Sequence, residues 1–169
     1  MLLAVGKKVI YPGHGPCLVS SIVDKTVDEK AITFYQLLVL GDHGEKLFVP
    51  VDKVKTVGIR PLLKQADVPK LFDQLKTPSA ASTDRKQRAC DNAKLLSSGS
   101  AFDLAEIVES LTELGETKAL SSRERATLDR AKRLLVYEIS EVMGATKQEA
   151  EQQVDQALIA GRRTIACAV

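Results

Sequence analysis

The spacing of apolar residues changes abruptly at Arg60–Pro61, and this change constrains the fold more than any other feature. Up to that point β-branched and aromatic residues recur with a period close to two, interrupted by Gly, Pro and Asp, as in short strands. After it, apolar residues recur at helical spacing. Because strands and helices distribute side chains with different periods, one type of element cannot satisfy both patterns. The chain of 169 residues is therefore predicted to form two small domains, residues 1–62 and 63–169.

Short strands are predicted in the N-terminal part, at about 6–11, 17–23, 32–40, 45–50 and 54–59. Tyr11–Pro16 supplies a turn between the first two strands, and Asp42-His43-Gly44 a tight hairpin between the third and fourth. Strands this few and short do not make a two-sheet sandwich of ordinary size. The economical fold is a small, strongly bent β barrel of the SH3 or Tudor type, and with the helices that follow it predicts an α+β protein.

About five helices are predicted after Pro61. The first is capped by Asp67 and ends at Leu75, and the second covers about 84–97 and stops at Gly99. Later helix starts show the spacing of a capping box or a close variant, with Ser or Thr followed three residues later by an acidic residue. These pairs are Ser100–Asp103, Ser121–Glu124 and Thr146–Glu149. The C-terminal domain is therefore predicted to be an all-α bundle.

Residue types used in catalysis and metal binding are scarce in this chain. The cysteines Cys17, Cys90 and Cys167 are widely spaced and form no CxxC pair, which indicates neither a disulfide framework nor a zinc site. Cys17 near His14 is the beginning of a nucleophile pair, but the His lies in a Gly-rich turn and no third orienting group is evident. We therefore predict a protein that is not an enzyme and has no metal, no cofactor and no small-molecule substrate.

Charge is distributed unevenly, although the formal net charge is only +2. Basic residues outnumber acidic ones over 61–100, and Arg85-Lys86-Gln87-Arg88 opens the second predicted helix, where the helix dipole disfavours cations. Such a run favours contact with a polyanion, although basic clusters are also common on ordinary protein surfaces. The start MLLAVGKKV is too short for a signal peptide, and no apolar run approaches the ~18 residues of a membrane span. We therefore expect a cytoplasmic protein without membrane contact.

Short motifs with a characteristic order and spacing occur along nearly the whole chain. In the first domain they are Val9–Pro12, Val49–Pro50 and Val57–Arg60. In the second they include Ala105–Val108 and the pattern Leu-Ser-x-x-Glu-Arg-x-x-Leu-x-x-Ala-Lys-x-Leu-Leu at 120–135. Through these motifs the chain resembles the CarD/CdnL group of bacterial RNA polymerase-binding transcription regulators.

The resemblance implies that the first domain is Tudor-like and docks on the RNA polymerase β subunit through a sheet edge. A sheet edge suits this role because its unpaired backbone groups can add a strand from a partner. The docking residues that the resemblance implies are Lys25, Leu47, Phe48, Val49 and Pro50.

The resemblance also implies that the helical domain lies against promoter DNA. Family members place a tryptophan in the minor groove at the start of the second helix, where this chain has Arg85. Because a guanidinium does not replace an indole between separated base pairs, the predicted contact is weak and directed to phosphates. The predicted DNA-contacting residues are Arg85, Lys86, Arg88 and Arg125. The alternative, from another functional class, is an interaction module that binds a different protein and has no promoter role.

Overall fold

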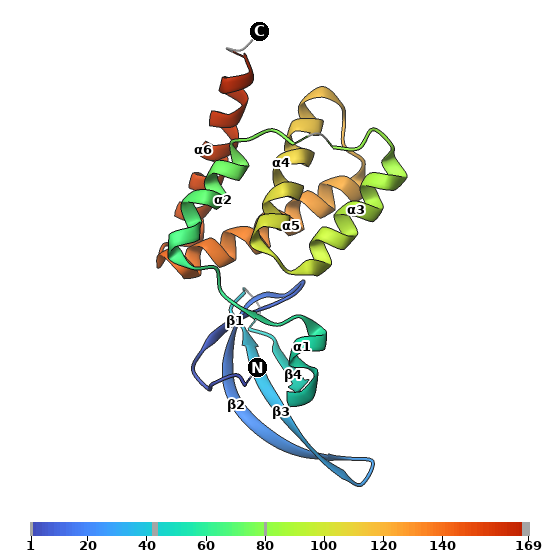
Figure 1. Ribbon diagram of the computed structural model, residues 1–169, viewed down its shortest axis with the longest axis vertical. Helices are drawn as coiled ribbons and strands as arrows, with labels where there is room; N and C mark the ends of the chain where they lie inside the picture. Colours follow the sequence, from blue (N-terminus) through green and yellow to red (C-terminus); the bar gives the residue numbers. More distant parts are fainter. Residues whose placement is uncertain (1, 42–43, 80, 167–169) are drawn as a thin grey trace. The chain divides into compact units, whose positions relative to one another are not determined.

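A computed structural model describes residues 2–41, 44–79 and 81–166 of the chain. The chain divides into two compact units, Met1–Leu62 and Leu63–Val169, and Figure 1 labels most of the helices and strands of each. The first unit carries all the strands described, and the second carries the long helices. Two sequence expectations, the tip of the Asp42-His43 hairpin and the environment of Cys167, fall outside the described residues.

The first unit contains a five-stranded antiparallel sheet in the order β4-β3-β2-β1-β5. Its strands are β1 (Lys8–Tyr11), β2 (Gly15–Val27), β3 (Lys30–Val39), β4 (Lys46–Pro50) and β5 (Arg60–Pro61). This sheet followed by helices confirms the α+β prediction with a Tudor-like N-terminal domain. Because β4 ends the order, one side of it pairs with β3 and the other side is an edge of the sheet.

The β2–β3 hairpin is longer than the strands beside it. Its turn places Asp28 at φ 47° and Glu29 at φ 62°, the left-handed backbone that a two-residue type I′ turn requires. Strands β2 and β3 pair with each other as far as Val27 and Lys30, next to the turn. Strand β4 pairs with β3 only from Phe34 onward, so residues 30–33 of β3 have β2 as their one neighbouring strand in the described part of the chain. The hairpin therefore ends in a two-stranded ribbon, which curves away from the other strands of the sheet in Figure 1.

The predicted strand at 54–59 is wrong. Residues Val51–Lys53 form a 3₁₀ turn (η1) and Val54–Val57 form a short helix, α1, that ends at Gly58 with φ 83°. The fifth strand is instead β5, which pairs with β1. The apolar residues 51, 54 and 57 recur every three positions, which places them on one side of a helical turn, with Val54 only 1% exposed.

The second unit is built from five long helices in the described residues, as the sequence predicted. They are α2 (Val68–Leu75), α3 (Arg85–Ser98), α4 (Ala101–Thr117), α5 (Ser122–Met143) and α6 (Lys147–Ala166). Their buried apolar residues form one core, to which α2, α4, α5 and α6 contribute. No helix in the described ranges is both long and apolar enough to cross a membrane.

The predicted helix starts are mostly confirmed. Ser121 and Glu124 form a complete capping box, Ser100 accepts a bond from the Asp103 amide, and Thr146 exchanges bonds with Glu149. Asp67 differs, because a 3₁₀ turn, η2 (Gln65–Asp67), precedes α2 and leaves the Asp67 side chain without a capping bond. Caps are readable from sequence because the partners lie within one turn of each other.

Candidate functional site

The edge strand β4 carries the residues expected to dock on a partner except Lys25, which lies on β2, and the side chains along β4 alternate between the two faces of the sheet. Leu47 and Val49 face the core, and Val49 is only 2% exposed. The Val49 side chain is already packed inside the unit, so Val49 could contact a partner only through its backbone, and its role in docking stays a prediction. Phe48 points to the other face, where it is 43% exposed.

Phe48 and Lys25 come together although β3 lies between their strands. The Lys25 Nζ atom lies 3.7 Å from the centroid of the Phe48 ring, a cation–π contact. The backbone of β4 beside Phe48 belongs to the sheet edge, and Pro50 ends the strand. The structure thus assembles an exposed aromatic ring, a cation and an open strand edge in one place.

A cleft of about 750 Å³ lies between α3 and α5 in the second unit. Arg85 and Lys86 line it from the first turn of α3, and Arg123 lines it from the first turn of α5. None of these cations has an ion-pair partner among the described residues. The rest of the lining is mostly small or polar: Ala89, Asn92, Ala93, Leu96, Ser121, Ser122, Glu124 and Thr127.

Arg88 does not contact solvent, and the prediction that it binds phosphates is wrong. Its side chain is only 4% exposed. The Nη2 atom lies 2.8 Å from the Oε1 atom of Glu124, and the Nε atom donates to the same oxygen at 3.2 Å. The Nη1 atom donates to the carbonyl oxygens of Ser82 and Thr83 at 2.7 and 3.0 Å. The guanidinium is thus committed to partners within the protein.

Glu124 divides its two oxygens between two helices. Its Oε1 accepts from Arg88 of α3, while its Oε2 accepts from the amide and hydroxyl of Ser121 at 2.9 and 2.7 Å. The bonds from Arg88, followed by those from Ser121, lower the pKa of the Glu124 carboxyl to about 2. The carboxylate is therefore ionised at neutral pH and accepts hydrogen bonds from both partners.

Arg125 lies on α5 but outside the α3–α5 cleft. The residue of α5 that does line the cleft is Arg123, which the sequence did not predict. Two residues along a helix correspond to a rotation of roughly 200°, so Arg125 points away from the face that carries Arg123 and Thr127. The spacing of Arg123 and Thr127, four residues apart, was the available signal. This spacing identifies residues of the cleft only if the face of α5 that lies against α3 is known, and the sequence does not give that face.

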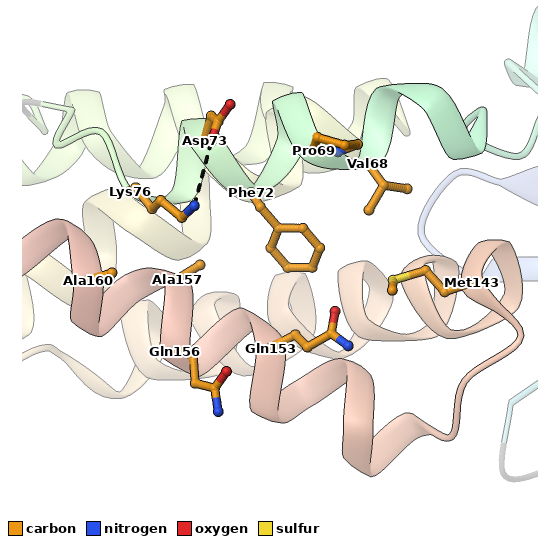
Figure 2. Close-up of a pocket in the computed structure, with 10 residues that line it drawn as sticks. All are labelled: Val68, Pro69, Phe72, Asp73, Lys76, Met143, Gln153, Gln156, Ala157 and Ala160. Carbon is orange, nitrogen blue, oxygen red and sulfur yellow. Dashed lines mark ion pairs between the residues drawn. The ribbon is translucent and has the colours of Figure 1, made fainter.

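A second hollow, of about 600 Å³, lies between α2 and α6 (Figure 2). Phe72 and Met143 point into it, and Gln153 and Gln156 border it on α6. Its charged lining residues, Asp73 and Lys76, pair with each other at 3.6 Å. It therefore offers no uncompensated cation and is not a candidate for binding a polyanion.

At one end of this hollow α6 approaches the C-terminal end of α2 very closely. A β-carbon at Gly161 would lie 2.6 Å from the carbonyl oxygen of Lys76. Glycine is therefore what allows this helix contact. The walls of the hollow are fixed by packing within the unit.

The Cys17–His14 pair does not form a catalytic site. Cys17 is fully buried, its thiol donates to the Gly15 carbonyl at 3.5 Å, and burial raises its pKa to about 12. His14 instead contacts Tyr11 and lies 3.8 Å from a carboxylate oxygen of Glu45. A buried neutral thiol is not a nucleophile. Within the described residues no group of three or more His, Cys, Asp or Glu is placed to hold a metal ion.

The first unit thus carries an open sheet edge and the second a cationic cleft, and comparison with known proteins identifies the class of the chain as transcription factor. The model of the CarD C-terminal domain matches residues 70–155, and that of the CarD-like/TRCF RID domain matches residues 3–63. The chain belongs to the CarD family. It is 25% identical over 152 residues to the "Putative transcription factor YdeB" of Bacillus subtilis (strain 168), a match that spans 88% of this chain and 97% of that protein.

Proposed function

We propose that this protein regulates transcription by binding the RNA polymerase β subunit through the β4 edge, while the α3–α5 cleft contacts promoter DNA weakly. The observation that carries the proposal is the open edge of β4 beside the exposed Phe48–Lys25 pair. The family assignment supports a role in transcription, and the partner is the one that the family resemblance implies.

The chemistry of the β4 edge suits a protein partner. Unpaired amide and carbonyl groups along an edge strand can bond to a strand from another chain. Exposed aromatic rings supply much of the binding energy at protein interfaces, and Phe48 is placed where such a strand would arrive. Lys25 adds a positive charge that favours an acidic partner surface.

The α3–α5 cleft suits the phosphates of a nucleic acid rather than its bases. Its cations Arg85, Lys86 and Arg123 come from two helices, and no aromatic side chain lines it. Without an aromatic ring to stack in an opened base step, the DNA contact is sequence-tolerant and depends strongly on salt. Arg125, exposed on another face of α5, would add at most a peripheral phosphate contact.

Titration of the full chain with RNA polymerase core enzyme tests the proposal. Phe48→Asp should weaken binding at least tenfold, because it places a charge where the proposed complex would bury the phenyl ring against the partner. Ile159→Asp is the matched control, since Ile159 is 44% exposed but lies in the helical unit. Equal binding by both variants would contradict the assignment to β4.

The alternative is an interaction module that uses the same edge for a different protein and has no promoter role. The same titration separates the two, because such a module would not bind polymerase even with Phe48 intact. Polymerase binding that persists in Phe48→Asp but is lost on changing the helical unit would reverse the roles of the two units.

A further inference from the structure

The cations of the α3–α5 cleft belong to two helices whose relative position must be fixed if they are to act together. Arg85 and Lys86 stand at the start of α3, and Arg123 stands at the start of α5. These side chains repel each other, so their convergence opposes the packing of the two helix ends. An attractive contact between the same helix ends offsets such repulsion directly.

The ion pair of Arg88 and Glu124 is that contact. Arg88 lies in the first turn of α3 together with Arg85 and Lys86, and Glu124 follows Arg123 directly in the first turn of α5. The Nη2–Oε1 distance is 2.8 Å, and both side chains are nearly enclosed, with 4% and 12% exposed. A charged hydrogen bond shielded from water resists separation much better than an exposed one.

The pair also fixes the chain segments on either side of it. Arg88 binds the carbonyls of Ser82 and Thr83 just before α3, and Glu124 completes the capping box that begins α5. Neither side chain has a polar atom left over for a ligand. Arg88 does not line the cleft, and Glu124 lines it with a carboxylate whose two oxygens are already bonded within the protein.

We infer that Arg88 and Glu124 are positioning residues for DNA binding, which bring the cations of α3 and α5 onto one phosphate-binding surface without touching DNA. This inference rests on the proposed DNA contact of the cleft. It assigns a functional role to a negatively charged residue in the middle of a surface that attracts a polyanion.

The inference predicts an effect opposite to that of charge alone. Glu124→Gln removes a negative charge beside three cations, so a surface acting only through its net charge would bind DNA more tightly. If Glu124 acts by position, the variant binds more weakly, because the neutral amide holds Arg88 less firmly and the helix ends separate. The sign of the change therefore distinguishes the two explanations.

The test is a fluorescence-anisotropy titration of a DNA duplex with the full chain at several low salt concentrations. Glu124→Gln and Arg88→Lys should each bind about 5- to 10-fold more weakly, and the slope of log affinity against log salt should become shallower by about one unit as one phosphate contact is lost. Arg88→Lys keeps the charge but loses the fork that reaches Glu124 and both carbonyls.

Asp129→Asn is the matched control, because it removes an exposed negative charge from the same helix. It should bind DNA as tightly as the parent or slightly more tightly. Thermal unfolding of each variant ensures that titrations are made well below its transition. A merely structural role would lower the transition temperature without changing the salt slope of the folded protein.

The outcomes are distinct. Parent protein that binds no duplex even at the lowest salt overturns the proposed DNA contact, and with it this inference. Parent protein that binds, together with Glu124→Gln that binds equally or more tightly with an unchanged slope, overturns the positioning role alone. If Glu124→Gln does not fold, Arg88→Lys decides in the same way.

Discussion

The surfaces proposed for binding on the two units differ in their chemistry. The β4 edge offers backbone groups and one exposed aromatic ring, with the Lys25 cation over that ring. The α3–α5 cleft offers three cations and no aromatic ring. The first surface suits a folded protein partner, whose recognition depends on shape and strand pairing, and the second suits a flexible or repeating anion. The proposed function therefore predicts that the two units bind their partners by different interactions.

The largest expected effect concerns the stability of the helical unit. Leu135 is fully buried in its core, and Leu135→Ala should lower the free energy of unfolding by ~2–5 kcal/mol, through lost burial and the cavity left behind. Leu128→Ala, at a partly buried position of the same helix, should cost less. Thermal unfolding followed by circular dichroism measures both. Equal transitions for Leu135→Ala and the parent would mean that this face of α5 does not hold the unit together.

The next largest effect is the salt dependence of binding, which should differ between the two surfaces. If Arg85, Lys86 and Arg123 each contact one phosphate, affinity for duplex DNA should fall by about 40-fold between 50 and 200 mM salt, from a slope of about −0.9 per phosphate. Polymerase binding through β4 should change much less over this range. Parallel titrations with the two partners make the comparison, and equal salt slopes would show that the surfaces do not differ in kind.

The charge beside Phe48 should have a smaller effect. Lys25→Glu removes the cation–π contact and reverses a charge at the rim, so polymerase binding should weaken by ~1–2 kcal/mol. Lys30→Glu makes the same charge change at an exposed position next to the hairpin turn and should leave affinity nearly unchanged. A similar loss in both variants would point to general attraction instead of a specific contact at Phe48.

The smallest effects concern two carboxyls of the helical unit with opposite pKa shifts. Burial raises the pKa of Glu109, which accepts a hydrogen bond from the Ser79 amide, so its stabilising contribution is complete at low pH and is lost as pH rises through the folded pKa. The pKa of Glu124 is lowered to about 2, so its contribution is present above about pH 4.5 and is lost as pH falls toward 2.

Glu109→Gln should therefore stabilise the unit slightly at neutral pH and lose this advantage in acid, while Glu124→Gln should destabilise it at neutral pH. Denaturant unfolding at several pH values between 3 and 8 measures both trends. The same pH dependence in the two variants would contradict the opposite environments of these carboxyls.

Features that depend on neighbouring residues were readable from the sequence. The capping boxes at Ser121 and Thr146 and the stop at Gly99 all rest on spacings of a few residues. The change in period at Arg60–Pro61 likewise coincides with the boundary between the two compact units. Caps and helix ends depend on contacts between residues close in the chain, so they can be recognised from residue spacing alone.

The local pattern gave a wrong prediction at residues 54–59, where the spacing of apolar residues fits both a strand and a helical turn. Val54, Val57 and Ile59 were assigned to a strand, whereas Val54–Val57 is a helical turn that closes against the core of the sheet. With so few residues, neither period is established by itself. The packing of Val51 and Val54 beneath the sheet decided the outcome.

The role of each charged side chain was decided by tertiary structure. Arg88 belongs to the same basic run as Arg85 and Lys86, but its partner Glu124 lies 36 residues away and draws it into the protein. Lys25 and Phe48 meet across an intervening strand, and Arg123 joins the cleft only because α5 begins beside α3. Sequence alone determined that this chain carries a sheet domain, a helical domain and a cluster of cations. Which cations remain free for a partner was decided by contacts between residues far apart in the chain, because an ion pair such as Arg88–Glu124 forms only where folding brings the two charges within hydrogen-bonding distance.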